Sequence, residues 1–199
     1  MTSASCRVVL ATGNAGKQRE LAALLAPRGF ELVLQTALGI TSAAETGTTF
    51  EANALLKARH ASRAAQLPAL ADDSGIEVDA LGGRPGVLSA RYAGEQASDA
   101  DNNALLLHEL TSVSQPQRGA RYRCVIAYVT HGDDPVPLIA VGSWEGQIAI
   151  APRGAGGFGY DSLFIPFGST LTAAQMSAAD KNAASHRAKA LAALVEQLR

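Results

Sequence analysis

A short polar segment interrupts an apolar run near the start of the chain and ends in a lysine. Residues 8–11 are apolar, residues 12–17 read Thr-Gly-Asn-Ala-Gly-Lys, and leucines at helical spacing follow. A strand that turns through small residues into a helix presents unpaired backbone N–H groups where the helix dipole also favours an anion. The segment therefore indicates a phosphate site, although a surface turn with a solvated lysine would use the same residue types.

The segment matches neither of the two common glycine fingerprints for phosphate binding. Gly13 and Gly16 do not give the pattern G-x-G-x-x-G. Gln18 follows Lys17 where the pattern G-x-x-x-x-G-K-[ST] requires a hydroxyl. The sequence therefore excludes both a Rossmann loop and a Walker loop.

Two adjacent carboxylates stand at the end of an apolar run. Asp72 and Asp73 are followed by Ser74 and Gly75. Because successive strand residues point to opposite faces, the two carboxylates cannot perform the same task. One can hold a hard cation while the other orients a loop or a side chain. An Asp-rich turn that ends a strand is the alternative interpretation.

A third carboxylate precedes a helix that should begin near Phe50. Glu45 lies in a glycine-containing loop, and Asn53 and Lys57 lie on one face of the helix at positions i and i+4. This is more polar chemistry than a helix start requires. A solvated, charged helix face is the alternative.

The segment PRGAGGFGYD, residues 152–161, contains four glycines around one phenylalanine, Phe158. Such a segment lets the backbone approach a ligand while the aromatic ring offers a stacking surface for a base. A mobile loop with one anchoring aromatic would have the same composition.

Three donors, Lys181, His186 and Arg187, occur near the C-terminus. On one straight helix they would point in different directions around its circumference. Ser185 is a good N-cap, so a break there would place His186 and Arg187 in the first turn of the last helix and Lys181 on the preceding turn. An exposed basic helix start is the alternative.

Composition and charge restrict the class of protein. The chain has 199 residues, of which 47% are hydrophobic, and a net charge of -1. It should form a globule without the basic surface that duplex nucleic acid or an anionic membrane requires. The two cysteines, Cys6 and Cys124, lack metal-ligand spacing and suit buried thiols of a reducing compartment. No stretch approaches a membrane span or a secretion signal, so we expect a cytoplasmic protein with no nucleic-acid or membrane partner.

Strand and helix patterns alternate along the chain, which predicts an α/β or mixed α+β fold in a single domain, residues 1–199. The expected helices are 16–25, 50–65, 99–111 and a last, core-facing helix. Thr48 with Glu51 should cap the second helix, and Ser98 or Asp99 the third. The expected strands are 7–11, 31–35, 67–72, 76–81 and an antiparallel pair, 121–130 and 136–143, which 145–150 continues.

Taken together, these segments closely resemble the inosine triphosphate pyrophosphatase family, the Ham1-like non-standard purine nucleoside triphosphatases. The resemblance extends from Val8 to the last helix and includes GGRPGVLSARYAG, residues 82–94. It implies an elongated fold with a central mixed sheet, two lobes flanked by helices and a nucleotide cleft between the lobes. Ser162 stands where the family often has proline, and Ala188 where it often has glycine, which affects loop rigidity more than chemistry.

The resemblance also implies a reaction. Water attacks a non-standard purine nucleoside triphosphate (dITP, ITP or XTP) with the help of Mg²⁺, and gives the monophosphate and pyrophosphate. That activity would clear deaminated purines from the nucleotide pool. A homodimer is implied as well.

By the same resemblance, Asp73 is the proton acceptor. Glu45 and Asp73 can hold Mg²⁺, and Asp72 can assist either the metal or the base; the sequence does not separate these roles. The implied substrate-binding residues are Thr12, Gly13, Asn14, Ala15, Gly16, Lys17, Lys57, Ser74, Phe158, Gly159, Tyr160, Asp161, Lys181, His186 and Arg187. The three donors near the C-terminus would suit the 6-oxo group of hypoxanthine and leave adenine's amino group without an acceptor. The ring of Phe158 would stack on either purine.

Two other functions use the same nucleotide chemistry. A nucleotide-binding regulator without turnover would need cations more than it needs carboxylates such as Glu45, Asp72 and Asp73. A kinase-like phosphotransferase is disfavoured by the missing Walker pattern.

Overall fold

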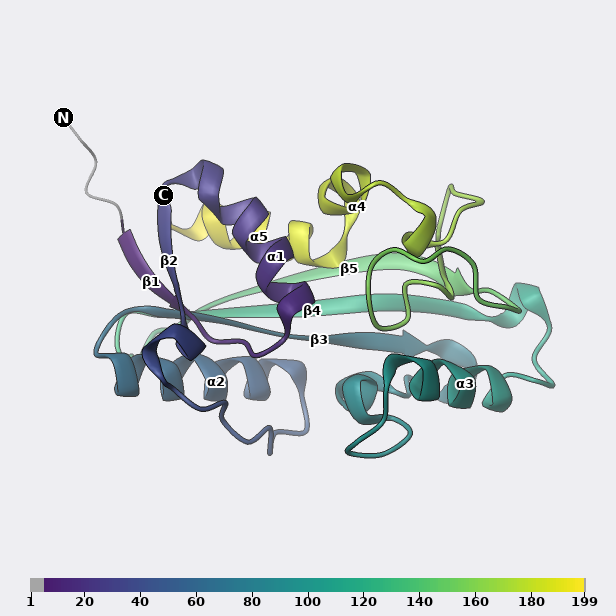
Figure 1. Ribbon diagram of the computed structural model, residues 1–199, viewed down its shortest axis with the longest axis horizontal. Coiled ribbons are helices and arrows are strands. Elements are labelled where there is room, and N and C mark those ends of the chain that lie inside the picture. Colours follow the sequence, from purple (N-terminus) through teal and green to yellow (C-terminus); the bar gives the residue numbers. More distant parts are fainter. Residues whose placement is uncertain (1–5, 199) are drawn as a thin grey trace. The chain divides into compact units, whose positions relative to one another are not determined.

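The computed structural model describes residues 6–198, which form a mixed six-stranded sheet in the order β2-β1-β3-β4-β5-β6 (Figure 1). β1 pairs in parallel with β2 and β3, whereas β5 pairs antiparallel with β6. The strands are β1 (Cys6–Leu10), β2 (Phe30–Leu34), β3 (Ala69–Val78), β4 (Gly119–Val129), β5 (Leu138–Ile148) and β6 (Phe164–Pro166). The predicted mixed α/β class is therefore confirmed.

Five α-helices accompany the sheet in these described residues. They are α1 (Ala15–Leu25), α2 (Phe50–Ala65), α3 (Asp99–Glu109), α4 (Ala178–Ala184) and α5 (His186–Gln197). The predicted break at Ser185 is confirmed, since this residue has extended backbone between α4 and α5. None of the helices within residues 6–198 combines the length and apolarity needed to cross a membrane.

The chain divides into two compact units, and β3, β4 and β5 contribute residues to both. The first unit comprises residues 1–73, 124–142 and 187–199; the second comprises 74–123 and 143–186. In the first, α1 and α5 lie on one face of the strands and α2 on the other (Figure 1). The predictions of one domain and of a nucleotide cleft between two lobes stay predictions.

Each unit has its own apolar core. The core of the first is built from β1, α1, β3, β4 and α5, with residues such as Leu10, Leu21, Leu70, Ile126 and Leu191 fully buried. The core of the second contains Ile76, Leu106, Trp144, Leu163 and Phe164. Burial of large apolar side chains stabilises a fold by roughly 1.5–3 kcal/mol each. Each core therefore fixes the backbone of its own unit, and with it the positions of the polar side chains that this backbone carries.

The prediction of separate strands at 67–72 and 76–81 is wrong, because β3 runs without interruption to Val78. The alternative of an Asp-rich turn that ends the strand is wrong as well, and Gly75 lies within β3, where it allows a close approach. A Cβ atom there would lie 2.4 Å from both the Gly86 carbonyl oxygen and the Ser89 hydroxyl. That hydroxyl instead accepts the N–H of Ile76 at 2.9 Å. The residues after Val78 form a 3₁₀ turn, Asp79–Leu81.

Two further boundaries differ from the sequence prediction. Residues 145–150 do not form a new strand, because β5 continues through the buried Trp144 to Ile148. The cap of α2 is Thr49, whose hydroxyl accepts the N–H of Ala52 at 3.1 Å, and not Thr48. By contrast, Ser98 and Asp101 form the capping box that opens α3.

The thiol of Cys124 generates a first prediction. This residue is fully buried in β4, and burial raises the pKa of its thiol to about 12. The thiolate is the reactive form, so a Cys6→Ser variant, which keeps only this cysteine, should not react with an aromatic disulfide reagent at mildly alkaline pH. Absorbance should rise by one thiol equivalent after addition of guanidinium chloride. Rapid reaction of the native variant would contradict the burial.

Candidate active site

The predicted phosphate segment forms a compact turn between β1 and α1. The Thr12 hydroxyl accepts the N–H of Asn14 at 3.2 Å, and the Asn14 side chain caps α1 by accepting the N–H of Lys17 at 3.0 Å. Gln18 donates to the Thr12 carbonyl at 2.9 Å. The turn is thus shaped by its own side chains, and it directs the start of an eleven-residue helix away from β1. This is the anion-favouring geometry expected from the sequence.

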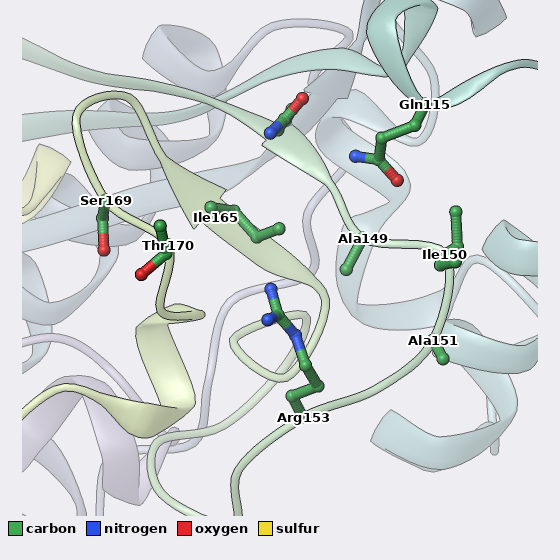
Figure 2. A pocket seen from close by; sticks show the side chains of 9 residues that line it. Gln115, Ala149, Ile150, Ala151, Arg153, Ile165, Ser169 and Thr170 are labelled. Carbon is green, nitrogen blue, oxygen red and sulfur yellow. The ribbon is translucent and has the colours of Figure 1, made fainter.

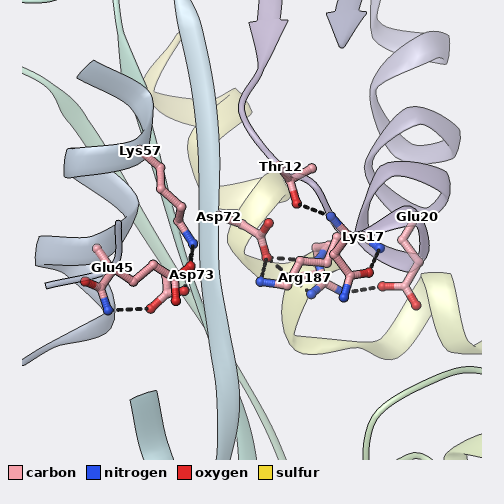
Figure 3. A network of polar contacts seen from close by, with 10 residues as sticks. Thr12, Lys17, Glu20, Glu45, Lys57, Asp72, Asp73 and Arg187 are labelled. Atoms are coloured by element: carbon pink, nitrogen blue, oxygen red, sulfur yellow. Dashed lines mark hydrogen bonds and ion pairs between the residues drawn. The ribbon is translucent and has the colours of Figure 1, made fainter. Parts of the chain in front are cut away.

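Asp72 and Asp73 point to opposite sides of β3, as the strand alternation predicts (Figure 3). Asp72 lies on the side of α1 and α5, and Asp73 lies on the side of α2. Both side chains are buried, with Asp72 1% and Asp73 5% exposed. The two carboxylates therefore have separate partners.

Asp72 is neutralised by two cations. Its Oδ2 lies 3.1 Å from the Lys17 ammonium and 3.2 Å from Nη2 of Arg187. Burial alone would raise the pKa of Asp72, but the charges of Lys17 and Arg187 outweigh it and hold this pKa well below its ordinary value. Asp72 is consequently ionised at any physiological pH.

Arg187 is itself one of the most buried side chains, at 1% exposure. Besides Asp72, its guanidinium binds the carboxylate of Glu20 on α1. Glu20 follows Lys17 by three residues, so both face the same site from one helix. The sequence reasoning did not single out Glu20; its position one turn after Lys17 is the signal that could have found it.

On the other side of β3, Lys57 joins two carboxylates. Its ammonium lies 2.8 Å from Oδ1 of Asp73 and 2.7 Å from Oε1 of Glu45. The fully buried Asn53 donates to Asp73 at 3.3 Å, and its side-chain oxygen accepts the N–H of Gly47 at 2.8 Å. Asn53 thereby ties the loop that carries Glu45 to the helix.

The pKa of Asp73 differs in direction from that of Asp72. Burial raises the pKa of Asp73, and the charges of Lys57 and Lys17 offset this only in part, while Glu45 adds to it. A raised pKa improves a carboxylate as a proton acceptor near neutral pH. Of the two aspartates, Asp73 has the electrostatics of a base.

The residues of this group can be tested for a metal site. Glu45 and Asp73 each place one hard carboxylate oxygen on the same ammonium. Within residues 6–198, no cluster of three or more His, Cys, Asp or Glu side chains could hold a metal by itself. Mg²⁺, however, is often bound by one or two carboxylates, several waters and the phosphates of a substrate. The donor set therefore fits this ion.

In the second unit, Asp161 organises the predicted base-stacking loop. Its Oδ2 accepts the N–H of Phe158 at 2.9 Å and lies 2.5 Å from the Lys181 ammonium. That ammonium also lies 4.8 Å from the centroid of the Phe158 ring. A side chain at Gly157 would lie 2.0 Å from the same Oδ2, so only glycine allows the carboxylate to fold back.

Aromatic residues complete this second group. The Tyr122 hydroxyl donates to Oδ1 of Asp161 at 3.3 Å, and the Tyr122 ring stacks on His186 with centroids 4.7 Å apart. The hydroxyl of Tyr160 donates to the Ser89 carbonyl at 2.8 Å. Tyr122 was missed by the sequence reasoning because nothing in its local pattern distinguishes it from other strand residues.

The structure thus gathers the predicted residues into two groups, one in each unit. The first unit contains Thr12, Gly13, Asn14, Ala15, Gly16, Lys17, Glu45, Lys57, Asp73 and Arg187, and the second contains Ser74, Phe158, Gly159, Tyr160, Asp161, Lys181 and His186. Arg187 makes its described contacts with carboxylates of the first unit. The roles assigned to these residues stay predictions.

A separate cavity of about 590 Å³ lies in the second unit (Figure 2). Arg153 and Gln115 extend toward it from different segments, and Ala149 and Ile165 supply apolar walls. Its other lining residues are Gln147, Ile150, Ala151, Ser169 and Thr170. Arg153 belongs to the glycine-rich segment 152–161, but none of the residues to which the sequence analysis assigned a role lines this cavity, so it is not the predicted site.

The model of the Ham1 family matches residues 8–197, which include the turn after β1, the two aspartates of β3 and the loop around Phe158. The chain belongs to the Ham1 family.

Similar proteins cover nearly the whole chain. A dITP/XTP pyrophosphatase of Shigella flexneri is 54% identical over 193 residues, which are 97% of this chain and 98% of the relative. One of Methylococcus capsulatus is 56% identical over 193 residues, 97% of this chain and 96% of the relative. A solved HAM1 protein structure from Coxiella burnetii matches with a TM-score of 0.89 and 44% identity, covering 97% of this chain and 98% of that one.

The burial of Arg187 generates a second prediction. Arg187→Ala would leave the buried Asp72 with Lys17 as its remaining close cation, and breaking a buried pair costs about 3–5 kcal/mol. The free energy of unfolding from urea titration should fall by that order. Arg7→Ala is the matched control, because it removes an arginine from a pair whose side chains are both 55% exposed and should cost less than about 1 kcal/mol. Equal losses in the two variants would refute the assignment.

Proposed function

We propose that this chain hydrolyses the non-standard purine nucleoside triphosphates dITP, ITP and XTP to the monophosphate and pyrophosphate. The observation that carries the proposal is the near-complete match, at 54% and 56% identity, to relatives named dITP/XTP pyrophosphatase. Removal of deaminated purines from the nucleotide pool follows as the biological role.

The proposal extends to Mg²⁺ as the metal, with Glu45 and Asp73 as the protein ligands. Two hard oxygens that meet at one point, the Lys57 ammonium, support this choice. When bound, Mg²⁺ supplies positive charge that bridges phosphate oxygens and stabilises the charge developing on them.

Asp73 accepts the proton of the attacking water in this proposal. Its raised pKa supports that role, and the nearby charge of Lys57 favours the ionised form of the carboxylate. Asp72 remains ionised between Lys17 and Arg187. Its task is to hold these two cations in place, which assists the reaction without a second base.

The cations at the site balance the charge of a triphosphate. Lys17 begins α1, where the first-turn N–H groups and the helix dipole attract anions. Lys57 lies across β3, and the pKa of its ammonium is raised because Asp73, Asp72 and Glu45 outweigh the effect of burial. The ammonium groups of Lys17 and Lys57 can stabilise the leaving pyrophosphate.

Base recognition falls to the second group of residues and to Arg187. Phe158 supplies a stacking face, and Lys181, which lies against its ring, supplies N–H donors. A 6-oxo purine accepts from such donors, whereas adenine presents a donor of its own. Rejection of GTP, whose 6-oxo group matches that of ITP, must come from shape or backbone contacts around the 2-position.

The alternative is a nucleotide-binding regulator without turnover. The pair of Asp73 and Lys57, with its raised carboxylate pKa, favours an enzyme, since binding alone needs no proton acceptor. From the family resemblance we also propose a homodimer in the cytoplasm, with purine nucleoside triphosphates as its partners.

A third prediction tests the reaction and its base together. Purified protein with Mg²⁺ should convert dITP and XTP to monophosphate and pyrophosphate, and chelation with EDTA should abolish this. Asp73→Asn is nearly isosteric, yet it removes the charge that the proton acceptor and metal ligand need, so kcat should fall on the order of 10²-fold or more. Asp133→Asn makes the same change at a carboxylate that is 82% exposed and should leave kcat unchanged. Binding of dITP without any pyrophosphate release by the native protein would instead favour the regulator.

A fourth prediction concerns base selection. Arg187→Ala should lower kcat/KM for dITP more than for dATP and shrink their ratio by about tenfold, the usual effect of a lost charged hydrogen bond. Phe158→Ala should lower both values about equally, because stacking distinguishes purines poorly. The ratio does not depend on the folded fraction, so the lower stability of the arginine variant does not affect it. If the ratio is unchanged while both values fall, Arg187 only holds Asp72.

A further inference from the structure

Phe158 stands between two glycines whose backbone lies in the left-handed region. Gly157 has a φ of +74° and Gly159 a φ of +60°. Glycine loses more conformational freedom on ordering than any other residue. A ring on a Gly-Phe-Gly segment therefore keeps one orientation only if other parts of the chain fix the backbone on either side of it.

All four backbone polar groups of Phe158 and Gly159 have hydrogen-bond partners. Asp161 binds both groups of Phe158: its carboxylate accepts the N–H at 2.9 Å, and its own N–H donates to the carbonyl at 3.2 Å. Helix α3 binds both groups of Gly159. The Asp99 carboxylate accepts the N–H of Gly159 at 2.6 Å, and Asn103 Nδ2 donates to its carbonyl at 2.8 Å.

We call Asp99 and Asn103 the α3 clamp. They lie one turn apart, and the Nδ2 atom of Asn103 also donates to the Asp99 carbonyl at 2.7 Å. Asn103 is 9% exposed, and its Oδ1 is buried without a hydrogen-bond partner among the described residues. Rotation of the amide by half a turn would bring this oxygen against two carbonyl oxygens. The amide is therefore held in one orientation, even though one of its polar atoms remains unpaired.

An unpaired buried acceptor costs free energy of folding. The two hydrogen bonds to Gly159 do not cap α3, whose capping box is formed by Ser98 and Asp101. They order the loop beside Phe158 instead. Because different residues cap the helix and bind the loop, substitutions can test the position of the loop separately from the stability of α3.

We propose that Asp99 and Asn103 are positioning residues for purine binding, which hold Gly159 and through it fix the ring of Phe158 against the base. The inference rests on the proposed function for its substrate and on the two hydrogen bonds to Gly159 for its geometry. Neither residue touches the reacting phosphates in this account. Their effect passes through the ring.

The effect should fall on KM rather than on kcat. Base stacking contributes equally before and during attack on the phosphate, because the base does not change in the reaction. Stacking of a base on an aromatic side chain raises affinity by about 5- to 150-fold. Loosening the ring should therefore raise KM for dITP about tenfold, and kcat should stay within about twofold.

The fifth prediction uses three variants of α3. Asn103→Ala removes the clamp amide, and Asn103→Asp keeps its volume but replaces the donor by an acceptor, so both should raise KM about tenfold. Asp101→Ala is the matched control, because it removes the exposed carboxylate that accepts the Ser98 N–H at 2.9 Å and leaves Gly159 untouched. It should lower the melting temperature and leave KM unchanged. An unchanged KM in Asn103→Asp would show that the Asn103 donor does not position the loop, and would overturn its role in the proposal.

A double-mutant cycle shows whether the effect passes through the ring. In a Phe158→Ala background, Asn103→Ala should raise KM by less than about twofold further, since residues that act through each other are not additive. Additive increases would overturn the proposal.

Hydrogen exchange tests the clamp without any substrate. The Gly159 amide should exchange faster in Asp99→Ala and Asn103→Ala than in the native protein, and at the native rate in Asp101→Ala. Equal exchange in all four proteins would refute the clamp whatever the activity. Absence of pyrophosphate release by the native protein, with faster exchange in the two clamp variants, would refute the proposed function and retain the clamp.

Discussion

The candidate site depends on the alternation of side chains along one extended strand. Because neighbours point to opposite faces, β3 places Asp72 among two cations and Asp73 beside a single lysine that Glu45 shares. The first carboxylate is kept ionised, and the second has a raised pKa. One strand thus supplies two carboxylates of different basicity without a difference in residue type.

The buried charge of Asp72 also determines how the first unit is assembled. A carboxylate that is 1% exposed must be neutralised, and its partners come from α1 and from α5. Arg187 links these two helices further through Glu20. The ion pair with Asp72 also keeps Lys17 at the turn after β1. One contact therefore both neutralises the buried charge of Asp72 and positions Lys17, the proposed phosphate ligand.

Local sequence patterns predicted most helices and strands but not the tertiary contacts between residues far apart in the sequence. Periodicity and capping patterns located α2 and the start of α3. The prediction of two separate strands, 67–72 and 76–81, failed because sequence alone does not show that Ser89 packs against Gly75. For the site, alternation predicted the separation of Asp72 from Asp73. The family resemblance, and not spacing, grouped the distant segments. The partners Glu20, Tyr122 and Asn103 remained invisible because tertiary contacts alone give them a role.

The pairing of Arg187 with Asp72 has a consequence for the order of events during synthesis. The two residues are 115 positions apart, and α5 contributes to the apolar core of the first unit. A nascent chain that has been synthesised only to residue 185 has neither this arginine nor that helix. The first unit therefore acquires its full apolar core, and Asp72 its arginine partner, only after α5 has been synthesised. Folding of the earlier segments alone leaves the charge of Asp72 incompletely neutralised.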